Sequence, residues 1–178
     1  MNRVILIIAF LFIVSCDNYK SNSDYYNQIL INAIEKISPS VVGVTVNKEI
    51  SENEGNDGFG SGLAISRDGY IVTNAHVVDQ TNRITVTTMG GYKYSAEIIG
   101  LDILTDLALL KIEAENLVPA ILGSSNDLHR GEWAIALGNP YNLFSISKKP
   151  TSTIGIISGN NVNFGLKESG HVYQKMIQ

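Results

Sequence analysis

Apolar residues recur at spacings of three and four between residues 24 and 37, and this period predicts an α-helix. The apolar positions are Tyr26, Ile29, Leu30, Ala33, Ile34 and Ile37. Ser23 is the expected N-cap, because a serine side chain can accept a hydrogen bond from the first turn of a helix. Pro39 is expected to end the helix, since the residue before a proline avoids helical backbone angles.

The hydrophobic period changes to two at residue 41, and a period of two is typical of strands. The predicted strands cover residues 41–46, 59–66, 70–73, 83–89, 92–99 and 107–112. Residues 51–58 form a predicted loop, and Arg67-Asp68-Gly69 and Gly90-Gly91 are predicted turns between neighbouring strands. Several short strands with frequent turns and little helix indicate a small antiparallel β-barrel.

A second β-rich stretch follows a connector over residues 113–127. Its first two predicted strands cover residues 133–137 and 151–157, with Gly138-Asn139-Pro140 as a turn between them. Trp133 is expected in the core of this second part, and residues 141–150 are expected to form an exposed loop. The pattern therefore predicts an all-β protein with a short N-terminal helix.

The beginning of the chain has the features of a secretory signal. Residues 4–14 are apolar throughout, Arg3 precedes them and Ser15 follows them. A run of this length is too short to span a bilayer, since a transmembrane helix needs about 20 apolar residues. We therefore expect residues 1–15 to be a signal peptide and the protein to enter the periplasm.

The single cysteine of the chain lies at the end of this signal. The segment Ile13-Val14-Ser15-Cys16 resembles the lipobox of bacterial lipoproteins, in which the cysteine becomes the lipidated first residue. A lone thiol cannot form an internal disulfide, so a lipid anchor on Cys16 explains it better. We expect residues 16–23 to be a tether between the membrane and the folded part.

Charge and composition exclude several functions. The chain has 13 Lys and Arg against 17 Asp and Glu, a net charge of −4, whereas a nucleic-acid binder normally needs a concentrated basic face. Neither His-Glu-x-x-His nor a cysteine pair occurs, so we expect no metal site. The glycine cluster over residues 58–62 lacks the Gly-Lys-Ser/Thr of a phosphate loop, and we expect no cofactor.

Two residues are candidates for catalytic chemistry. His76 follows the predicted strand 70–73, where a short turn can present its ring, and Asp106 directly precedes the predicted strand 107–112. A histidine that acts as a general base needs a carboxylate on its Nδ1–H, which fixes the tautomer and stabilises the imidazolium. By spacing alone, a histidine near a strand end is more often structural or solvated, and an aspartate before a strand is more often a turn residue.

The sequence segments around these two residues resemble those of the HtrA family of bacterial trypsin-like serine proteases. The matching segments are GSGLAISRDGYIVTNAHVV, TDLALLKI, ALGNP and TIGIIS, in that order. The resemblance implies a chymotrypsin-like double β-barrel with the active site between the barrels, His76 as general base and Asp106 as its orienting carboxylate. On this basis residues 24–115 are expected to hold the helix and a complete first barrel. Residues 116–178 are expected to hold a connector and an incomplete second barrel.

The resemblance also implies a serine nucleophile in Gly-Asn-Ser-Gly-Gly, and this motif does not occur in the chain. Ile177-Gln178 resemble the first residues of the approach to it, so we expect a member truncated before its nucleophile. Ser61 lies between two glycines but belongs to a predicted strand of the first barrel. Four further serines also lack the Gly-x-Ser-x-Gly pattern: Ser124, Ser125, Ser158 and Ser169. We therefore expect this chain to be inactive, because loss of the serine cost another protease about 10⁶-fold in turnover.

Three functional interpretations stay open at this point. The first is a lipid-anchored quality-control endopeptidase that acts on unfolded or misfolded polypeptides, often as a homotrimer, as the resemblance implies. The second is a non-catalytic pseudoprotease or binding module anchored to the membrane. The third is a structural lipoprotein, which the joint presence of His76 and Asp106 in their motifs disfavours.

Overall fold

The computed structural model describes residues 22–51, 54–166 and 170–178. The chain divides into two compact units, residues 1–33 and residues 34–178. The predicted signal peptide and Cys16 lie outside the described residues. Within the described part, no helix is both long and apolar enough to cross a membrane.

Helix α1 spans Asn22–Ile37 and confirms the predicted N-terminal helix. It begins one residue before Ser23, so the prediction of Ser23 as N-cap is wrong. The chain then continues into the 3₁₀ helix η2 (Ser38–Ser40), in which the Ser38 hydroxyl donates to the Ile34 carbonyl at 2.6 Å. Pro39 lies in the first turn of η2 and ends the α-helical hydrogen bonding, as predicted.

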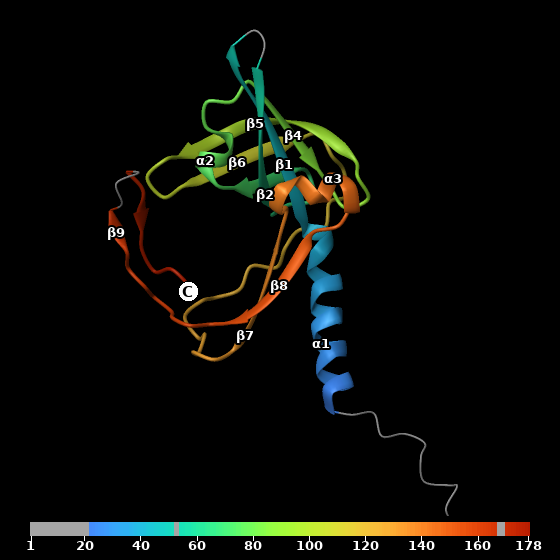
Figure 1. The fold of residues 1–178 in the computed structure, drawn as a ribbon, viewed down its shortest axis with the longest axis vertical. Helices are drawn as coiled ribbons and strands as arrows, with labels where there is room; N and C mark the ends of the chain where they lie inside the picture. Colours follow the sequence, from blue (N-terminus) through green and yellow to red (C-terminus); the bar gives the residue numbers. More distant parts are fainter. Residues whose placement is uncertain (1–21, 52–53, 167–169) are drawn as a thin grey trace, which may run out of the picture. The chain divides into compact units, whose positions relative to one another are not determined.

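A closed six-stranded antiparallel barrel follows the helix and confirms the predicted first barrel (Figure 1). Its strands are β1 (Val41–Ser51), β2 (Glu54–Ala64), β3 (Tyr70–Thr73), β4 (Arg83–Thr87), β5 (Lys93–Asp102) and β6 (Leu107–Ile112). The order around the barrel is β1-β2-β3-β6-β5-β4, and the barrel closes because β1 pairs with both β2 and β4. Strands β1 and β2 pair as far as Ser51 and Glu54, so much of the stretch where the sequence predicted a loop is strand.

The barrel interior is filled by the alternate apolar residues of its strands. Val42, Val44 and Val46 of β1 all point into this core, as do Leu110 and Ile112 of β6. The remaining core members are Ala64, Ile71, Val78, Ile84, Val86, Ala108 and Ala114. Period two therefore separates core from surface in these strands, and burial of their side chains supplies the main driving force for folding.

Two glycines allow the barrel to close tightly. A Cβ on Gly62 would lie 2.8 Å from Ile71 Cγ2 and 3.0 Å from Val42 Cγ2, inside the core. Gly69 has a φ of +106°, and a Cβ there would meet the carbonyl oxygen of Ile112. That carbonyl lies against the β2–β3 turn, and Ile112 in turn donates its N–H to Gly69 at 3.0 Å. The turn predicted at Arg67-Asp68-Gly69 is therefore required by the close packing of β6.

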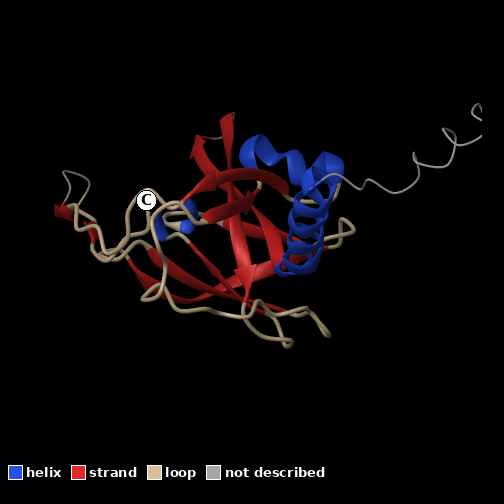
Figure 2. Cartoon of the chain, turned by 90° about the horizontal axis from the view of Figure 1, so that it is seen from below, coloured by secondary structure: helices blue, strands red, loops and turns tan. Residues whose placement is uncertain are grey.

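The C-terminal part of the described chain forms two small sheets (Figure 2). Strands β7 (Trp133–Gly138) and β8 (Thr151–Ile156) pair with each other, and so do β9 (Gly165–Leu166) and β10 (Val172–Tyr173). The mostly-β chymotrypsin-like fold with a short N-terminal helix is thus confirmed, and in the described residues the second set of strands is open.

Two predictions for this part are wrong. Trp133 is 70% exposed instead of lying in a core, although its strand pairs with β8. Residues 141–150 are not a plain exposed loop, since they contain the end of η3 (Pro140–Asn142) and the helix α3 (Leu143–Ser147). Phe144 of α3 is 1% exposed. It packs close to Gly43 of β1, where an added Cβ would lie 3.2 Å from the Cβ of Phe144.

Candidate active site

His76 lies on a short helix directly after the end of β3. Thr73 ends the strand, Asn74 is extended, and α2 (Ala75–Val78) begins at the next residue. Ala75 and Val78 are buried and hold this turn of helix on the barrel, whereas the His76 side chain is 59% exposed. The local sequence thus presents the imidazole at the surface of a fixed element, as the strand-end position predicted.

Asp106 lies at the end of the β5–β6 turn, immediately before β6. Its φ of +59° is in the left-handed region, which aspartate tolerates better than most residues. The turn is shaped by Asp102, whose carboxylate accepts the N–H groups of Leu104 and Thr105 at 3.0 and 3.2 Å. Asp106 itself is only 3% exposed, so its carboxylate must find partners inside the protein.

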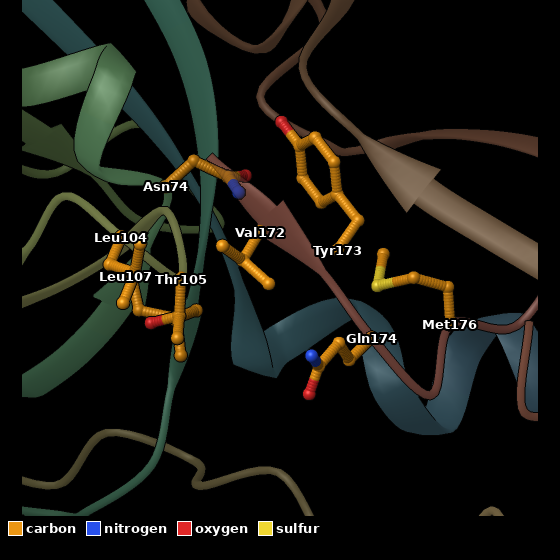
Figure 3. A pocket seen from close by; sticks show the side chains of 8 residues that line it. All are labelled: Asn74, Leu104, Thr105, Leu107, Val172, Tyr173, Gln174 and Met176. Carbon is orange, nitrogen blue, oxygen red and sulfur yellow. The ribbon is translucent and has the colours of Figure 1, made fainter. Parts of the chain in front are cut away.

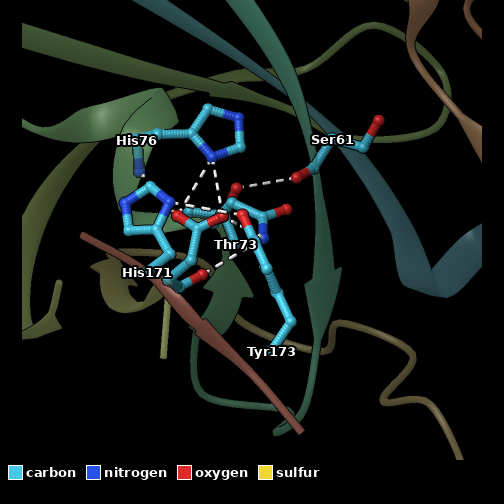
Figure 4. A network of polar contacts seen from close by, with 7 residues as sticks. Ser61, Thr73, His76, His171 and Tyr173 are labelled. Carbon is cyan, nitrogen blue, oxygen red and sulfur yellow. Dashed lines mark hydrogen bonds and ion pairs between the residues drawn. The ribbon is translucent and has the colours of Figure 1, made fainter. Parts of the chain in front are cut away.

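The structure brings His76 and Asp106 together (Figure 4). The Nδ1 atom of His76 lies 2.8 Å from Oδ2 and 3.0 Å from Oδ1 of Asp106. The backbone N–H of His76 also donates to Asp106 Oδ1 at 3.0 Å. Because an ionised carboxylate can only accept hydrogen bonds, His76 is the donor in both contacts. Its backbone N–H and its Nδ1–H together fix the carboxylate relative to the ring.

This geometry selects one tautomer of His76. A neutral imidazole that donates Nδ1–H to the carboxylate has an unprotonated Nε2, which can accept a proton from another group. A buried acceptor at Nδ1 and an exposed ring are the features that a histidine general base requires.

Electrostatics keep the Asp106 carboxylate ionised. Burial raises the pKa of Asp106, but the hydrogen bonds from the His76 backbone and ring lower it, as do the charges of His76 and His171. The net result is a pKa of Asp106 below its ordinary value. The carboxylate is therefore available as a negative partner over the whole neutral range.

Asn74 is a member of the site that the sequence did not single out. Its Nδ2 donates to Asp106 Oδ2 at 3.2 Å and to the Asp106 carbonyl at 3.1 Å. The same carbonyl accepts the N–H of Ala75 at 3.2 Å. Asn74 therefore ties the left-handed backbone at Asp106 to the helix that carries His76. Its place two residues before the histidine is the only sequence signal for this role.

Ser61 lies at the junction between β2 and the end of β7. Its hydroxyl oxygen accepts the N–H of Asn139 at 2.8 Å, and its carbonyl accepts the Thr73 hydroxyl at 2.7 Å. Asn139 is 3% exposed; its Nδ2 donates to the Gly60 carbonyl at 3.2 Å, and its Oδ1 accepts the Phe144 N–H at 2.7 Å. This set of bonds joins β2 to the end of β7 and to α3, so Ser61 and Asn139 are bound into the structure that connects the barrel to the second β-rich part.

A pocket of about 530 Å³ opens beside the turn that carries Asp106 (Figure 3). Leu104 and Leu107 line it from the barrel, and Val172, Tyr173 and Met176 line it from the C-terminal segment. Asn74 contributes a polar wall. The pocket therefore places mixed apolar and polar surface next to the His76–Asp106 pair.

Residues 22–51, 54–166 and 170–178 contain no group of three or more His, Cys, Asp or Glu side chains that could hold a metal ion. His129 lies far along the chain from the pair and contacts Glu132 at 3.0 Å on the surface.

Residues 60–177 match the family model described as a trypsin-like peptidase domain. The chain belongs to the trypsin-like peptidase family. Within this family it is a homologue of the HtrA-type serine proteases, which confirms the resemblance found in the sequence. It is 40% identical over 141 residues to the "Probable periplasmic serine endoprotease DegP-like" of Chlamydia trachomatis, covering 79% of this chain and 26% of that protein. It is 41% identical over 132 residues to the "Serine endoprotease DegS" of Haemophilus influenzae, covering 70% of this chain and 38% of that protein.

Solved structures of the same type share the fold. The HtrA-type protease AlgW with a tripeptide has a TM-score of 0.72 and 33% sequence identity, covering 83% of this chain and 44% of that one. This chain spans 26% of the length of its DegP-like relative. The match nevertheless includes the whole region between His76 and Asp106, because both lie within residues 60–177.

Proposed function

We propose that His76 is the general base and Asp106 the orienting carboxylate of a serine endopeptidase. In this reaction Nε2 of His76 takes the proton of a serine hydroxyl as the oxygen attacks the peptide carbonyl, and the ring later returns the proton to the leaving amine. Asp106 stabilises the imidazolium that forms between these steps. The observation that carries the proposal is the 2.8 Å contact between Nδ1 of an exposed histidine and a buried carboxylate.

We propose none of Ser61, Ser124, Ser125, Ser158 and Ser169 as the nucleophile. The sequence contains no Gly-Asn-Ser-Gly-Gly, and the hydroxyl of Ser61 already accepts the N–H of Asn139. The interactions of His76 in the structure are with Asp106. We therefore propose that the 178-residue polypeptide by itself does not hydrolyse peptides.

Serine-directed labelling tests this proposal. The 178-residue chain is expected to show no labelling by a fluorophosphonate and no cleavage of unfolded casein. A longer chain in which residues 1–178 are followed by a Gly-Asn-Ser-Gly-Gly segment is expected to do both. In that longer chain, Asp106→Asn should lower the turnover number by about 10⁴-fold, because the wrong histidine tautomer then faces the serine. Labelling of the 178-residue chain, or unchanged turnover in the Asp106→Asn variant, would contradict the assignment.

Polypeptides in an extended or unfolded state are the proposed substrates. The HtrA-type relative AlgW was solved with a tripeptide and with a decapeptide, and the DegP-like and DegS relatives are named endoproteases. A quality-control role for this chain, and a homotrimeric assembly, follow from the same resemblance. Sedimentation analysis of the purified protein tests the trimer, and a monomeric mass at micromolar concentration would refute it.

The periplasm is the proposed location, since the DegP-like relatives are named periplasmic. The proposed attachment is a lipid on Cys16, supported by the apolar run at residues 4–14 and by the lipobox-like segment that ends at Cys16. A Cys16→Ala variant is expected to leave the membrane fraction. The idea fails if that variant still sediments wholly with membranes.

A non-catalytic pseudoprotease or binding module anchored to the membrane is the alternative function. Such a module would bind unfolded polypeptides without cleaving them. A casein complex that is retained, with no cleavage even in the longer serine-containing chain, would favour this alternative over the peptidase.

A further inference from the structure

The side chain of Asn74 is bonded to Asp106, although Asn74 lies at the N-cap position of a helix. An asparagine at such a position commonly accepts a backbone N–H of the first turn through its side-chain oxygen. The Asn74 side chain makes no capping bond in α2, and its backbone is extended, with a φ of −79° and a ψ of 144°. Its amide instead donates to Oδ2 and to the carbonyl oxygen of Asp106, at 3.2 and 3.1 Å. Helix capping therefore does not account for this asparagine.

Each oxygen of the Asp106 carboxylate has a donor that does not belong to an imidazole. The backbone N–H of His76 donates to Oδ1 at 3.0 Å, and the Asn74 amide donates to Oδ2 at 3.2 Å. Oδ2 is also the oxygen nearer to Nδ1 of His76, at 2.8 Å. An ionised carboxylate and a carbonyl can only accept, so the side chain at residue 74 must donate to pair with them. The plane of the carboxylate is thus fixed independently of the imidazole ring.

Asn74 also lies between the carboxylate and the neighbouring pockets. Its side chain lines the 530 Å³ pocket (Figure 3) and a second pocket of about 240 Å³, which Thr73 and Leu137 also line. Asp106 is 3% exposed and lines neither of these two pockets, whereas Asn74 is exposed. Removal of the amide is therefore expected to admit water to Oδ2 and to weaken its control of the carboxylate.

We propose that Asn74 is a positioning residue of the peptidase site: its amide holds Oδ2 of Asp106, so that the carboxylate keeps one orientation toward Nδ1 of His76. The proposal rests on the function proposed above and extends it to a residue that acts through Asp106. An asparagine that only filled space beside the carboxylate would be replaceable by any side chain of the same shape. If water took over the bond of the exposed amide, the carboxylate would keep its orientation without Asn74.

Nitrogen-15 NMR of the His76 ring in the 178-residue chain tests the positioning. Asn74→Ala removes the amide and suits the extended backbone, so the preference of neutral His76 for Nδ1–H should weaken. Exchange of that proton with solvent should become faster by about 10-fold or more, because a bond to a charged group is lost. Asn74→Asp keeps the shape, but its ionised carboxylate has no N–H and repels Asp106, so its effect should be at least as large. Asn126→Ala and Asn126→Asp are the matched controls at an exposed asparagine and should match the parent chain.

Turnover of the longer serine-containing chain provides the second readout. Asn74→Ala should lower kcat by about 10- to 100-fold and leave KM within about 2-fold, because a misplaced base slows the chemistry and not the binding. An unchanged His76 tautomer and kcat in Asn74→Ala overturn the proposal, as does a parental kcat in Asn74→Asp. If Asp106→Asn still loses turnover in that case, only the role of Asn74 fails. If Asp106→Asn keeps its turnover as well, the function proposed above fails.

Discussion

Asn139→Ala offers a sharp test of the junction between the barrel and the second β-rich part. The Asn139 side chain makes two hydrogen bonds, to the Gly60 carbonyl at 3.2 Å and from the Phe144 N–H at 2.7 Å. Its backbone N–H bond to Ser61 does not depend on the side chain. The backbone at Asn139 has a φ of −122°, so alanine adds no left-handed strain.

The magnitude follows from what each lost bond leaves behind. The Phe144 N–H is in a buried bond, and an unpaired buried donor costs about 1–3 kcal/mol. The Gly60 carbonyl is partly buried and loses a bond with a net contribution of about 0.5–1.5 kcal/mol. We therefore expect the free energy of unfolding to fall by about 2–4 kcal/mol, which corresponds to about 4–16 °C in Tm for a chain of this size.

Urea unfolding followed by circular dichroism and by the fluorescence of Trp133 measures this change, since Trp133 lies on β7. Asn126→Ala is the matched control, because Asn126 is exposed and its backbone N–H, which alanine keeps, donates to the Ser124 hydroxyl. A loss below about 0.5 kcal/mol in Asn139→Ala would refute the reasoning, since that is the range of ordinary surface substitutions.

Three further predictions concern the packing of the barrel and the ionisation of Asp106. Gly62→Ala should destabilise the chain by about 1–3 kcal/mol in urea unfolding, because its Cβ would lie 2.8 Å from Ile71, whereas Gly155→Ala has open space and should not show this packing penalty. Leu110→Ala, at a fully buried position, should cost about 2–5 kcal/mol in the same assay, and a cost below 1 kcal/mol would deny that the barrel interior is packed. The pKa of Asp106 is lowered in the folded state, so its contribution to stability is present above the unfolded pKa and is lost as pH falls through the folded pKa. In the acid range, the free energy of unfolding should therefore depend less steeply on pH in Asp106→Asn than in the parent chain. Urea unfolding at a series of acid pH values measures both dependences, and equal slopes would contradict an ionised Asp106 carboxylate in the folded state.

The barrel could be predicted because its strands carry a clear period of two. Val42, Val44 and Val46 alternate with less buried positions, and Ala108, Leu110 and Ile112 do the same in β6. The predicted strand positions therefore match the six barrel strands, although the β1–β2 hairpin continues through much of the expected loop. Local alternation is sufficient here because each strand buries one face.

The second β-rich part shows where local pattern fails. Trp133 is apolar, but its exposure depends on which strands cover the β7–β8 sheet, and that information is not local. Helix α3 is too short to show a helical period, and Phe144 is buried by contact with Gly43 of a distant strand. Tertiary contact, rather than periodicity, decides both positions.

The candidate site was partly predictable for a similar reason. His76 and Asp106 lie in recognisable sequence motifs. The structure places Nδ1 of His76 2.8 Å from Oδ2 of Asp106. Asn74 and Asn139 are single polar residues whose partners come from other parts of the chain. A sequence contains no local sign of such long-range hydrogen bonds and charges, because a turn asparagine looks the same with or without a tertiary partner.

The tautomer of His76 is the most direct test of the central claim that this ring is poised as a general base. Nitrogen-15 NMR of the 178-residue chain distinguishes the two ring nitrogens in the neutral form. We predict a protonated Nδ1 bonded to Asp106 and an unprotonated Nε2, with this preference lost in Asp106→Asn. A neutral His76 that carries its proton on Nε2 in the parent chain would contradict the account.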